Sequence, residues 1–512
     1  MLIARAALAA VCALVCVALL PPAPAEARRR PPVVLIVFDE FPTTGLLGNH
    51  RRIDRARFPN FARLAGDATW YRNATTVSDT TFSAVPAILE GRVPRYRSGG
   101  LRRARYSILN VLARHGYRVR GSPDARNLCP RRYCGPQRPT RYYLVHNRLR
   151  RLTSFVDSIS ATKRPTIWFK HTLLPHLPWI YLPSGKQYIR GVRAPIRGIN
   201  SELGVFERSL ERLSYQRHML QLAAVDGVLG RLLDRLEASG LYDRALLILT
   251  ADHGISFLRL GEEDKRIVTP GNVQGIAPVP LFVKRPGQRR GRVSGLYARN
   301  SDVAPTIARI TRVRLPWRTS GHPLPSRALR RRHTVHVGSR LPGLSAVRIG
   351  VRAFQARWAR AIRNMHALFG IGSIPRLYAI GPLRRVIGRP VGSSGRRLRV
   401  GTSPVARPGR FRASVLRAFE IRNVNPRSRL VPALVSGYIR GGRGRRRRNL
   451  AIAVNGRIVA TGRSFFLRGS SREGYAVIVP EGSFHPGPNQ VHVLAVGRKG
   501  KRRLKFRLLA RV

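Results

Sequence analysis

The chain has 512 residues, of which 43% are hydrophobic and 7% are aromatic, enough apolar material for a packed core. A wholly disordered or collagen-like chain is therefore excluded, and the length predicts two or three domains. Lys and Arg number 95 against 24 Asp and Glu, which gives a formal net charge of +71. This excess predicts contact with an anionic lipid or polymer. A coding bias that places Arg at tolerant surface positions is the alternative explanation.

The N-terminus has the pattern of an export signal. Arg5 precedes an unbroken apolar run over residues 6–20, which is shorter than the roughly 20 residues that a bilayer-spanning helix needs. Two Ala-x-Ala cleavage patterns follow within residues 23–27. We therefore predict a signal peptide over residues 1–27, with an uncleaved N-terminal anchor as the alternative. The protein is expected to be extracytoplasmic or at the cell surface.

One pair of cysteines lies outside the predicted signal. Cys129 and Cys134 are separated by four residues, and export to an oxidising compartment favours a disulfide between them. A metal site would need two further ligands nearby, and none stands at a familiar spacing. Export also argues against nucleic acid as the working partner, so an anionic component of the cell envelope is the expected substrate.

The first half of the chain alternates between strand and helix patterns. Residues 33–38 form a continuous apolar run, which is typical of a buried parallel strand. Helical periodicity over residues 212–236 is followed by two further strand patterns, at 245–249 and 279–283. This alternation predicts an α/β domain with a largely parallel central sheet.

Two of these strands end in residues that could carry chemistry. Asp39 follows the first strand, and Asp252 and His253 follow the strand at 245–249. Parallel sheets place their functional sites at the carboxyl ends of strands, so we expect these side chains to meet there. A turn or a helix cap is the plainer explanation for a single Asp after a strand.

The last part of the chain has a different pattern of predicted secondary structure. Residues 350–367 carry an apolar stripe at helical spacing, and short strand patterns dominate from residue 398 onward. Asn455-Gly456 separates two strand patterns and is typical of a type I′ hairpin turn. We predict a C-terminal antiparallel β domain over residues 398–512.

Four ordered segments resemble the sulfatase-like branch of the alkaline phosphatase superfamily. They are the strand that ends in Asp39-Glu40, the stretch from Phe58 to Gly91, the Leu249-Thr-Ala-Asp-His-Gly254 motif, and the pair Pro280–Pro286 and Asp302–Thr306. The resemblance implies an alkaline-phosphatase-like sandwich with a largely parallel central sheet over residues 31–325. Residues 326–397 are then expected to be a linking helical region before the C-terminal β domain.

The resemblance also implies a nucleophile. Sulfatases place a Cys or Ser, which is converted to formylglycine, ten residues before a Gly that matches Gly91, and counting back reaches Thr81. Phosphodiesterases similar to this family have a Thr-Phe pair there, as Thr81-Phe82 does, and phosphoethanolamine transferases have Pro where Pro86 stands. Thr81 is thus the implied nucleophile, with Thr80 as the fallback. A simple helix cap is the structural alternative.

The nucleophile departs from the pattern of true sulfatases, because Thr cannot become formylglycine. A Thr nucleophile resembles the phosphate-directed members, which include phosphodiesterases, phosphoethanolamine transferases and lipoteichoic acid synthases. We therefore expect a metal-dependent phosphodiesterase or phosphotransferase that acts on a cell-envelope substrate. The alternatives are a sulfuric-ester hydrolase and a non-catalytic surface protein that binds anionic glycans through its Arg residues.

The same resemblance implies a cofactor and its ligands. One divalent ion, Mn, Zn, Mg or Ca, would activate the weakly nucleophilic Thr hydroxyl. His176 matches a His-x-Pro loop that contacts substrate in relatives and is counted as catalytic, whereas His171 is expected to be a structural residue at a strand end. The implied metal ligands are Asp39, Glu40, Thr81, Asp252 and His253.

Overall fold

The computed structural model describes residues 30–93, 106–145, 147–189, 196, 208–257, 265–341, 343–394, 397–441, 446–467, 469–499 and 503–512. The predicted signal peptide over residues 1–27 lies outside the described residues. Within the described ranges, none of the helices combines the length and the apolar composition that crossing a membrane requires.

A seven-stranded sheet forms the centre of the first lobe, in the order β3-β4-β1-β5-β6-β2-β7. All neighbouring strands run parallel except β6, which is antiparallel to both β5 and β2. This confirms the largely parallel sheet that the sequence predicts. The strands are β1 (Val33–Asp39), β2 (Thr69–Tyr71), β3 (Arg118–Pro123), β4 (Thr166–Pro175), β5 (Leu246–Ala251), β6 (Leu281–Lys284) and β7 (Arg292–Ser294).

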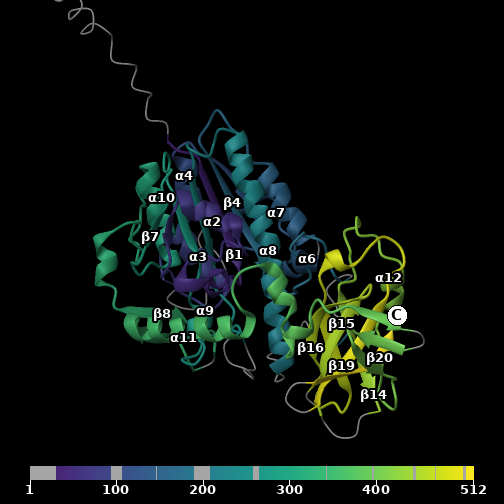
Figure 1. Ribbon diagram of the computed structural model, residues 1–512. Coiled ribbons are helices and arrows are strands. Elements are labelled where there is room, and N and C mark those ends of the chain that lie inside the picture. The colour runs from purple at the N-terminus through teal and green to yellow at the C-terminus, as the bar shows by residue number, and fades with distance from the viewer. Residues whose placement is uncertain are drawn as a thin grey trace, which may run out of the picture.

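Strand β1 is apolar throughout because both faces of the sheet are covered. Its alternate side chains enter two separate cores, with Val34 in one and Val33 in the other, and all seven residues are buried. In Figure 1, α4 and α10 lie on one side of the strands and α7 and α8 on the other. One face is covered by α2 (Pro59–Asp67), α7 (Arg148–Asp157) and α8 (Arg208–Ala238), and the other by α3 (Thr81–Glu90), α4 (Ile108–Arg114) and α10 (Val303–Thr311).

The segment between the two lobes contains more than the helix that the sequence predicts. The amphipathic helix α11 (Val351–Phe369) buries its apolar stripe, including Trp358, as expected. An antiparallel hairpin of β8 (Thr334–Gly338) and β9 (Ala346–Gly350) precedes it. The sequence analysis assigned this stretch to a helical linker and did not predict the hairpin, whose strands are only five residues long.

The C-terminal lobe consists of two β-sheets, drawn in green and yellow in Figure 1. The larger has the order β10-β11-β12-β20-β19-β15-β16 and the smaller β13-β14-β18-β17. Every pairing is antiparallel except that of β12 with β20. The strands are β10 (Val391–Ser394), β11 (Arg397–Val400), β12 (Ser403–Ala406), β13 (Arg412–Ala413), β14 (Leu434–Arg440), β15 (Asn449–Val454), β16 (Arg457–Arg463), β17 (Phe465–Phe466), β18 (Glu473–Ile478), β19 (Val491–Lys499) and β20 (Arg503–Arg511).

The predicted type I′ turn joins β15 to β16. Asn455 and Gly456 both have positive φ angles, of 47° and 79°, which this turn requires at both central positions. The remaining short helices are η1 (Thr43–Leu46), η2 (Asn49–Arg51), α5 (Arg131–Cys134), α6 (Thr140–Val145), α9 (Val273–Ile276), η4 (Asn300–Asp302), η5 (Arg327–Arg331), η6 (Ile374–Tyr378), η7 (Arg384–Val386), α12 (Ala418–Arg422) and η8 (Glu481–Ser483).

The two lobes share one apolar core. The cluster that covers one face of the central sheet continues through α11 and η6 into β14, β15 and β18. Isolated backbone bridges reinforce this contact, pairing Gln187 with Leu430 and Ala379 with Thr461. The C-terminal lobe is therefore packed against the first lobe rather than tethered to it.

A disulfide joins Cys129 to Cys134 at the end of α5, with 6.1 Å between their Cα atoms. It packs against Gly121 of β3, where a Cβ atom would come within 2.0 Å of the Cys134 sulfur. The absence of a side chain at Gly121 therefore makes room for the bridge.

We expect the peptides that contain Cys129 and Cys134 to react with an alkylating reagent only after reduction, because the two sulfurs are bonded to each other. Mass spectrometric mapping of denatured, exported protein, with and without reductant, measures this directly. Alkylation of either cysteine in the unreduced sample would contradict the pairing.

Candidate active site

The carboxyl ends of two neighbouring strands bring the predicted acidic residues together. β1 and β5 pair in parallel, with Phe38 opposite Ala251, so Asp39 and Asp252 leave the sheet at the same edge. Both are buried, at 1% and 0% exposure. Thr81 lies against them at the start of α3. Its Oγ1 is 3.4 Å from Oδ2 of Asp39 and 3.5 Å from Nε2 of His253.

The position of Thr81 follows from the boundaries of its helix. α3 begins at Thr81 and ends before Gly91, which adopts the left-handed conformation with a φ of 70°. A Cβ atom at Gly91 would come within 2.9 Å of Pro305, so glycine is required for packing as well as for the turn. The hydroxyl therefore lies at the N-terminus of a helix, where the helix dipole favours an anionic group.

His171 belongs to the site, although the sequence analysis expected a structural residue. It lies on β4, which pairs with the other edge of β1, and it is fully buried. Its Nε2 is 3.7 Å from Oδ2 of Asp39 and 3.8 Å from Oδ2 of Asp252. The sequence offered no periodic signal for this, because the contact depends on β4 lying beside β1.

This part of the site fits a divalent cation. Among the described residues, Oδ1 of Asp39, Oδ2 of Asp252 and both ring nitrogens of His171 are buried without a hydrogen-bond partner. Ligand atoms of these three residues lie within 4.8 Å of one another. His253 turns Nδ1 toward the Gly254 carbonyl oxygen, at 3.0 Å, so a proton on Nδ1 leaves the lone pair of Nε2 facing Thr81.

Electrostatics inside the site also favour a cation. Burial, together with the charges of Asp252 and Glu40, raises the pKa of Asp39 well above its usual range. Burial acts in the same direction on Asp252, but His253, His171 and Thr81 outweigh it and lower its pKa to about 2. Two carboxylates this close cannot both ionise cheaply unless a positive charge lies between them.

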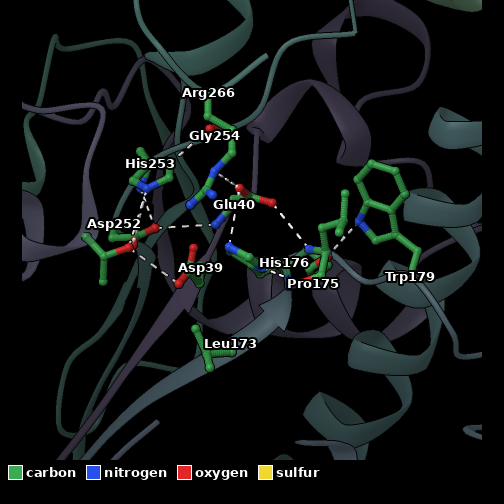
Figure 2. Close-up of polar contacts among 12 residues, drawn as sticks. Asp39, Glu40, Leu173, Pro175, His176, Trp179, Asp252, His253, Gly254 and Arg266 are labelled. Carbon is green, nitrogen blue, oxygen red and sulfur yellow. Dashed lines mark hydrogen bonds and ion pairs between the residues drawn. The ribbon is translucent and has the colours of Figure 1, made fainter. Parts of the chain in front are cut away.

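Glu40 has a different set of partners from the other two carboxylates. Figure 2 shows its carboxylate between Arg266, with which it forms an ion pair, and the imidazole of His176. Nε2 of His176 is 3.5 Å from Oε1, and the Leu177 amide donates to Oε2 at 3.3 Å. Asp39, Glu40 and His176 form a second group with metal-ligand spacing. Arg266 forms its ion pair with Glu40, and the raised pKa of Asp39 indicates that the charge of the pair Asp39 and Asp252 is less fully compensated.

The loop that carries His176 is held by two buried side chains. The Arg148 guanidinium donates to the carbonyl oxygens of Leu173 and His176, at 2.8 and 2.6 Å, and also to that of Pro178. The Gln221 amide donates to the His176 carbonyl at 3.0 Å. Burial lowers the pKa of His176 to about 4, so its ring is neutral near pH 7.

Two further residues of the site were missed by the sequence analysis. Arg266 comes shortly after residues 258–264, which lie outside the described residues, and its guanidinium forms an ion pair with Glu40. Asn300, in η4, donates to the Asp252 carbonyl oxygen at 3.0 Å and to Thr76 at 3.2 Å, which ties the end of β5 to the loop before α3. Neither contact has a local sequence signal, since each joins segments far apart in the chain.

Comparison with protein families identifies the first lobe. A family model described as Sulfatase matches residues 31–313, which is more than half of the chain. Arylsulfatase K of Xenopus laevis is 28% identical over 102 residues, covering 20% of this chain and 18% of that protein. N-acetylglucosamine-6-sulfatase of Bos taurus is 25% identical over 169 residues, covering 30% and 29%. The chain thus spans less than a third of the length of these curated relatives.

Two solved structures with a similar fold are described here. One was determined in complex with its substrate D-glucosamine-2-N,6-O-disulfate; it is 14% identical, with a TM-score of 0.47, covering 66% of this chain and 98% of that one. The other is the phosphonate monoester hydrolase of Agrobacterium radiobacter, 15% identical with a TM-score of 0.44, covering 66% and 96%.

Replacing Asp252 with Asn should strip divalent metal from the purified protein while the fold survives, because the amide lacks the charge that a dication requires. We expect the affinity for the metal ion to fall by more than the roughly 10- to 100-fold that is lost when a residue hydrogen-bonded to a metal ligand is replaced. Metal content after dialysis, and the shift in melting temperature on adding Mn²⁺ or Zn²⁺, measure it. Asp234→Asn, an exposed position on α8, is the matched control and should keep its metal; stoichiometric metal in the Asp252 variant would rule out this site.

His218 should make the protein sensitive to acid. It packs between Trp179 and Phe257 and donates to the Glu40 carbonyl at 3.1 Å, and burial lowers its pKa from 6.5 to about 4. Between these values the unfolded chain binds more protons, so the free energy of unfolding falls as the pH drops from 6.5 to 4. In urea titrations across this range, His218→Gln keeps a donor but cannot titrate, and should show a shallower pH dependence. An unchanged slope would show that His218 does not contribute.

Proposed function

Because the chain belongs to the Sulfatase family, we propose that it hydrolyses sulfuric esters with the help of one divalent cation. The observation that supports this most directly is the placement of the Thr81 hydroxyl between Asp39 and His253, at the N-terminus of α3. Both curated relatives described above are named as sulfatases. The sequence alone favoured phosphate chemistry, and these relatives favour the sulfuric ester instead.

The proposed catalytic arrangement divides the site into two parts. Asp39, Asp252, His253 and Thr81 would hold the cation, with His171 as an additional ligand that its unpartnered nitrogens support. A cation bound there would lower the pKa of the Thr81 hydroxyl and offset negative charge on the ester. Oγ1 of Thr81 would then bond to the sulfur or phosphorus atom and give up its proton to solvent, while the bond to the ester oxygen breaks and that oxygen takes up a proton to leave as the alcohol. Water subsequently cleaves the bond to Thr81.

The second part of the site lies around Glu40. Burial lowers the pKa of His176, its Nδ1 hydrogen-bonds to the Leu177 carbonyl oxygen, and its Nε2 lies 3.5 Å from Oε1 of Glu40. We assign His176 to substrate contact. We assign Arg266 to charge balance, because it neutralises Glu40 and so limits the net negative charge that an anionic ester would meet. Glu40 remains a candidate ligand through its grouping with Asp39.

A second candidate function is hydrolysis or transfer of a phosphate diester, and Thr81 itself favours it. Thr cannot be oxidised to formylglycine, so the hydrated aldehyde of sulfatases is absent from this site. An unmodified hydroxyl must attack directly, as in the phosphate-directed members that the nucleophile segment resembles. We also propose that the protein works outside the cytoplasm on an anionic substrate. The signal-like N-terminus supports this, as does the Cys129–Cys134 disulfide.

Replacing Thr81 with Ala tests the nucleophile. The change removes the attacking oxygen but little volume, so folding should survive while turnover falls by several powers of ten, on the order of 4 kcal/mol or more of barrier. Turnover of an aryl sulfate and of a bis-aryl phosphate, measured on wild type and variant, also ranks the two candidate functions.

The neighbouring hydroxyl provides the control. Thr80→Ala should retain most activity, because Thr80 precedes the helix and Thr81 is the residue that contacts Asp39. Intact-mass analysis of a quenched reaction should find a covalent adduct on wild type and none on the Thr81 variant. If neither substitution affects turnover, covalent catalysis is wrong and the role of a glycan-binding surface protein gains support.

A further inference from the structure

A cavity of about 550 Å³ opens beside the nucleophile. One wall is formed by residues 77–80 and by Ser83, which flank Thr81; Thr81 itself is not part of the lining. The other wall is the β8–β9 hairpin, whose connecting loop and strands line the space from His336 to Arg348. The hairpin lies next to α11 in Figure 1. The cavity therefore lies between the loop that precedes Thr81 and the segment that links the two lobes.

The hairpin is fixed to the nucleophile loop by backbone hydrogen bonds. The Asp79 amide donates to the Gly338 carbonyl at 3.1 Å, and the Gly338 amide donates to the Val77 carbonyl at 2.9 Å. The buried Asp79 carboxylate accepts from the amides of Val268 and Arg340, at 2.9 and 3.2 Å. These contacts hold the hairpin in a fixed position relative to the loop before Thr81, so the cavity is a preformed feature of the fold.

The charge of the cavity is positive. His336, Arg340 and Arg348 line it. Asp79, the one acidic residue among its lining, accepts hydrogen bonds from backbone amides, and the charge of Arg340 also acts on its carboxylate, which leaves Arg348 as the uncompensated cation of the lining. Within the ranges that the structure describes, the Arg348 guanidinium is exposed and makes no hydrogen bond or ion pair. Burial and the nearby charges of Arg348 and Arg299 lower the pKa of His336.

We propose that this cavity is a subsite for a second anionic group of the substrate, such as a sulfate or carboxylate on the alcohol side of the ester that Thr81 attacks. The inference rests on the proposed function, because it takes the ester to lie at Thr81. A guanidinium offers paired donors to a tetrahedral or planar oxyanion, and the polar Thr80 and Ser83 side chains supply further hydrogen bonds. Arg348 is then a specificity residue rather than a catalytic one.

Equilibrium binding tests the subsite without relying on turnover. The probes are glucosamine carrying two sulfate groups and its singly sulfated counterpart, which differ by one anionic group. Their dissociation constants are measured by calorimetry on the full-length Thr81→Ala protein. We expect the doubly sulfated probe to bind about tenfold more tightly, as a charge-assisted hydrogen bond implies. Adding Arg348→Gln should remove this preference, and Arg348→Lys should keep most of it.

Arg363→Gln, an exposed position on α11 outside the cavity, is the matched control and should leave the preference unchanged. Equal affinity for the two probes in the parent protein, or a preference that survives Arg348→Gln, would overturn the subsite. The Arg363→Gln change in the otherwise wild-type chain should turn over a small aryl sulfate at the wild-type rate. Failure of wild type to hydrolyse any ester would count against the proposed function, while the binding preference would still be measurable.

Discussion

Three carboxylates buried at one edge of a parallel sheet impose the constraint on which this structure depends. Burying a charge without compensation is expensive, and Asp39, Glu40 and Asp252 are all at most 1% exposed. Arg266 compensates Glu40. Asp39 and Asp252 face the Thr81 hydroxyl, the imidazoles of His171 and His253, and backbone amides. The charge of Arg266 also acts on Asp39, yet the pKa of Asp39 stays well above its usual range, so the compensation is incomplete. A divalent cation completes this balance, which is why the cluster is best explained as a metal centre.

The residues around that centre are held by regular elements or by loops that are themselves tied down. β1 lies between β4 and β5, so His171 and Asp252 approach Asp39 from opposite neighbours. Arg148 from α7 donates to the Leu173 carbonyl near the end of β4 and to two carbonyl groups of the loop that follows, those of His176 and Pro178. Catalytic geometry demands such support, because a small displacement of the reacting groups costs a large part of the rate.

The start of helix α3 contributes residues both to the proposed catalytic site and to the neighbouring cavity. Its first turn presents Thr81 to the acidic cluster and presents Thr80 and Ser83 to the neighbouring cavity. Membership of the Sulfatase family favours a sulfate ester as the substrate. An unmodified Thr at the proposed nucleophile position favours a phosphate ester instead. Both are tetrahedral oxyanion esters that need charge neutralisation, so the proposed metal centre would serve either. The β8–β9 hairpin is where the chain can distinguish substrates that differ beyond the ester.

Local patterns in the sequence predicted several strands, a hairpin turn and part of the candidate site. The apolar run at 33–38 predicted β1 because a strand covered on both faces must be apolar at every position. The turn at Asn455-Gly456 followed from the conformations that those two residues tolerate. The resemblance to sulfatases, carried by ordered motifs, placed the central sheet, and with it Asp39, Asp252 and His253 at one edge. These features depend on residues close together in the chain or at a fixed spacing.

Tertiary structure alone decided the rest. His171 entered the metal cluster because β4 lies beside β1, and the order of strands in a sheet leaves no mark on the residues of one strand. Arg266 reached Glu40 across more than two hundred residues of sequence, and the β8–β9 hairpin became a cavity wall only by pairing its backbone with the loop before Thr81. Periodicity and turn chemistry are local, whereas charge compensation and cavity formation depend on which distant segments meet.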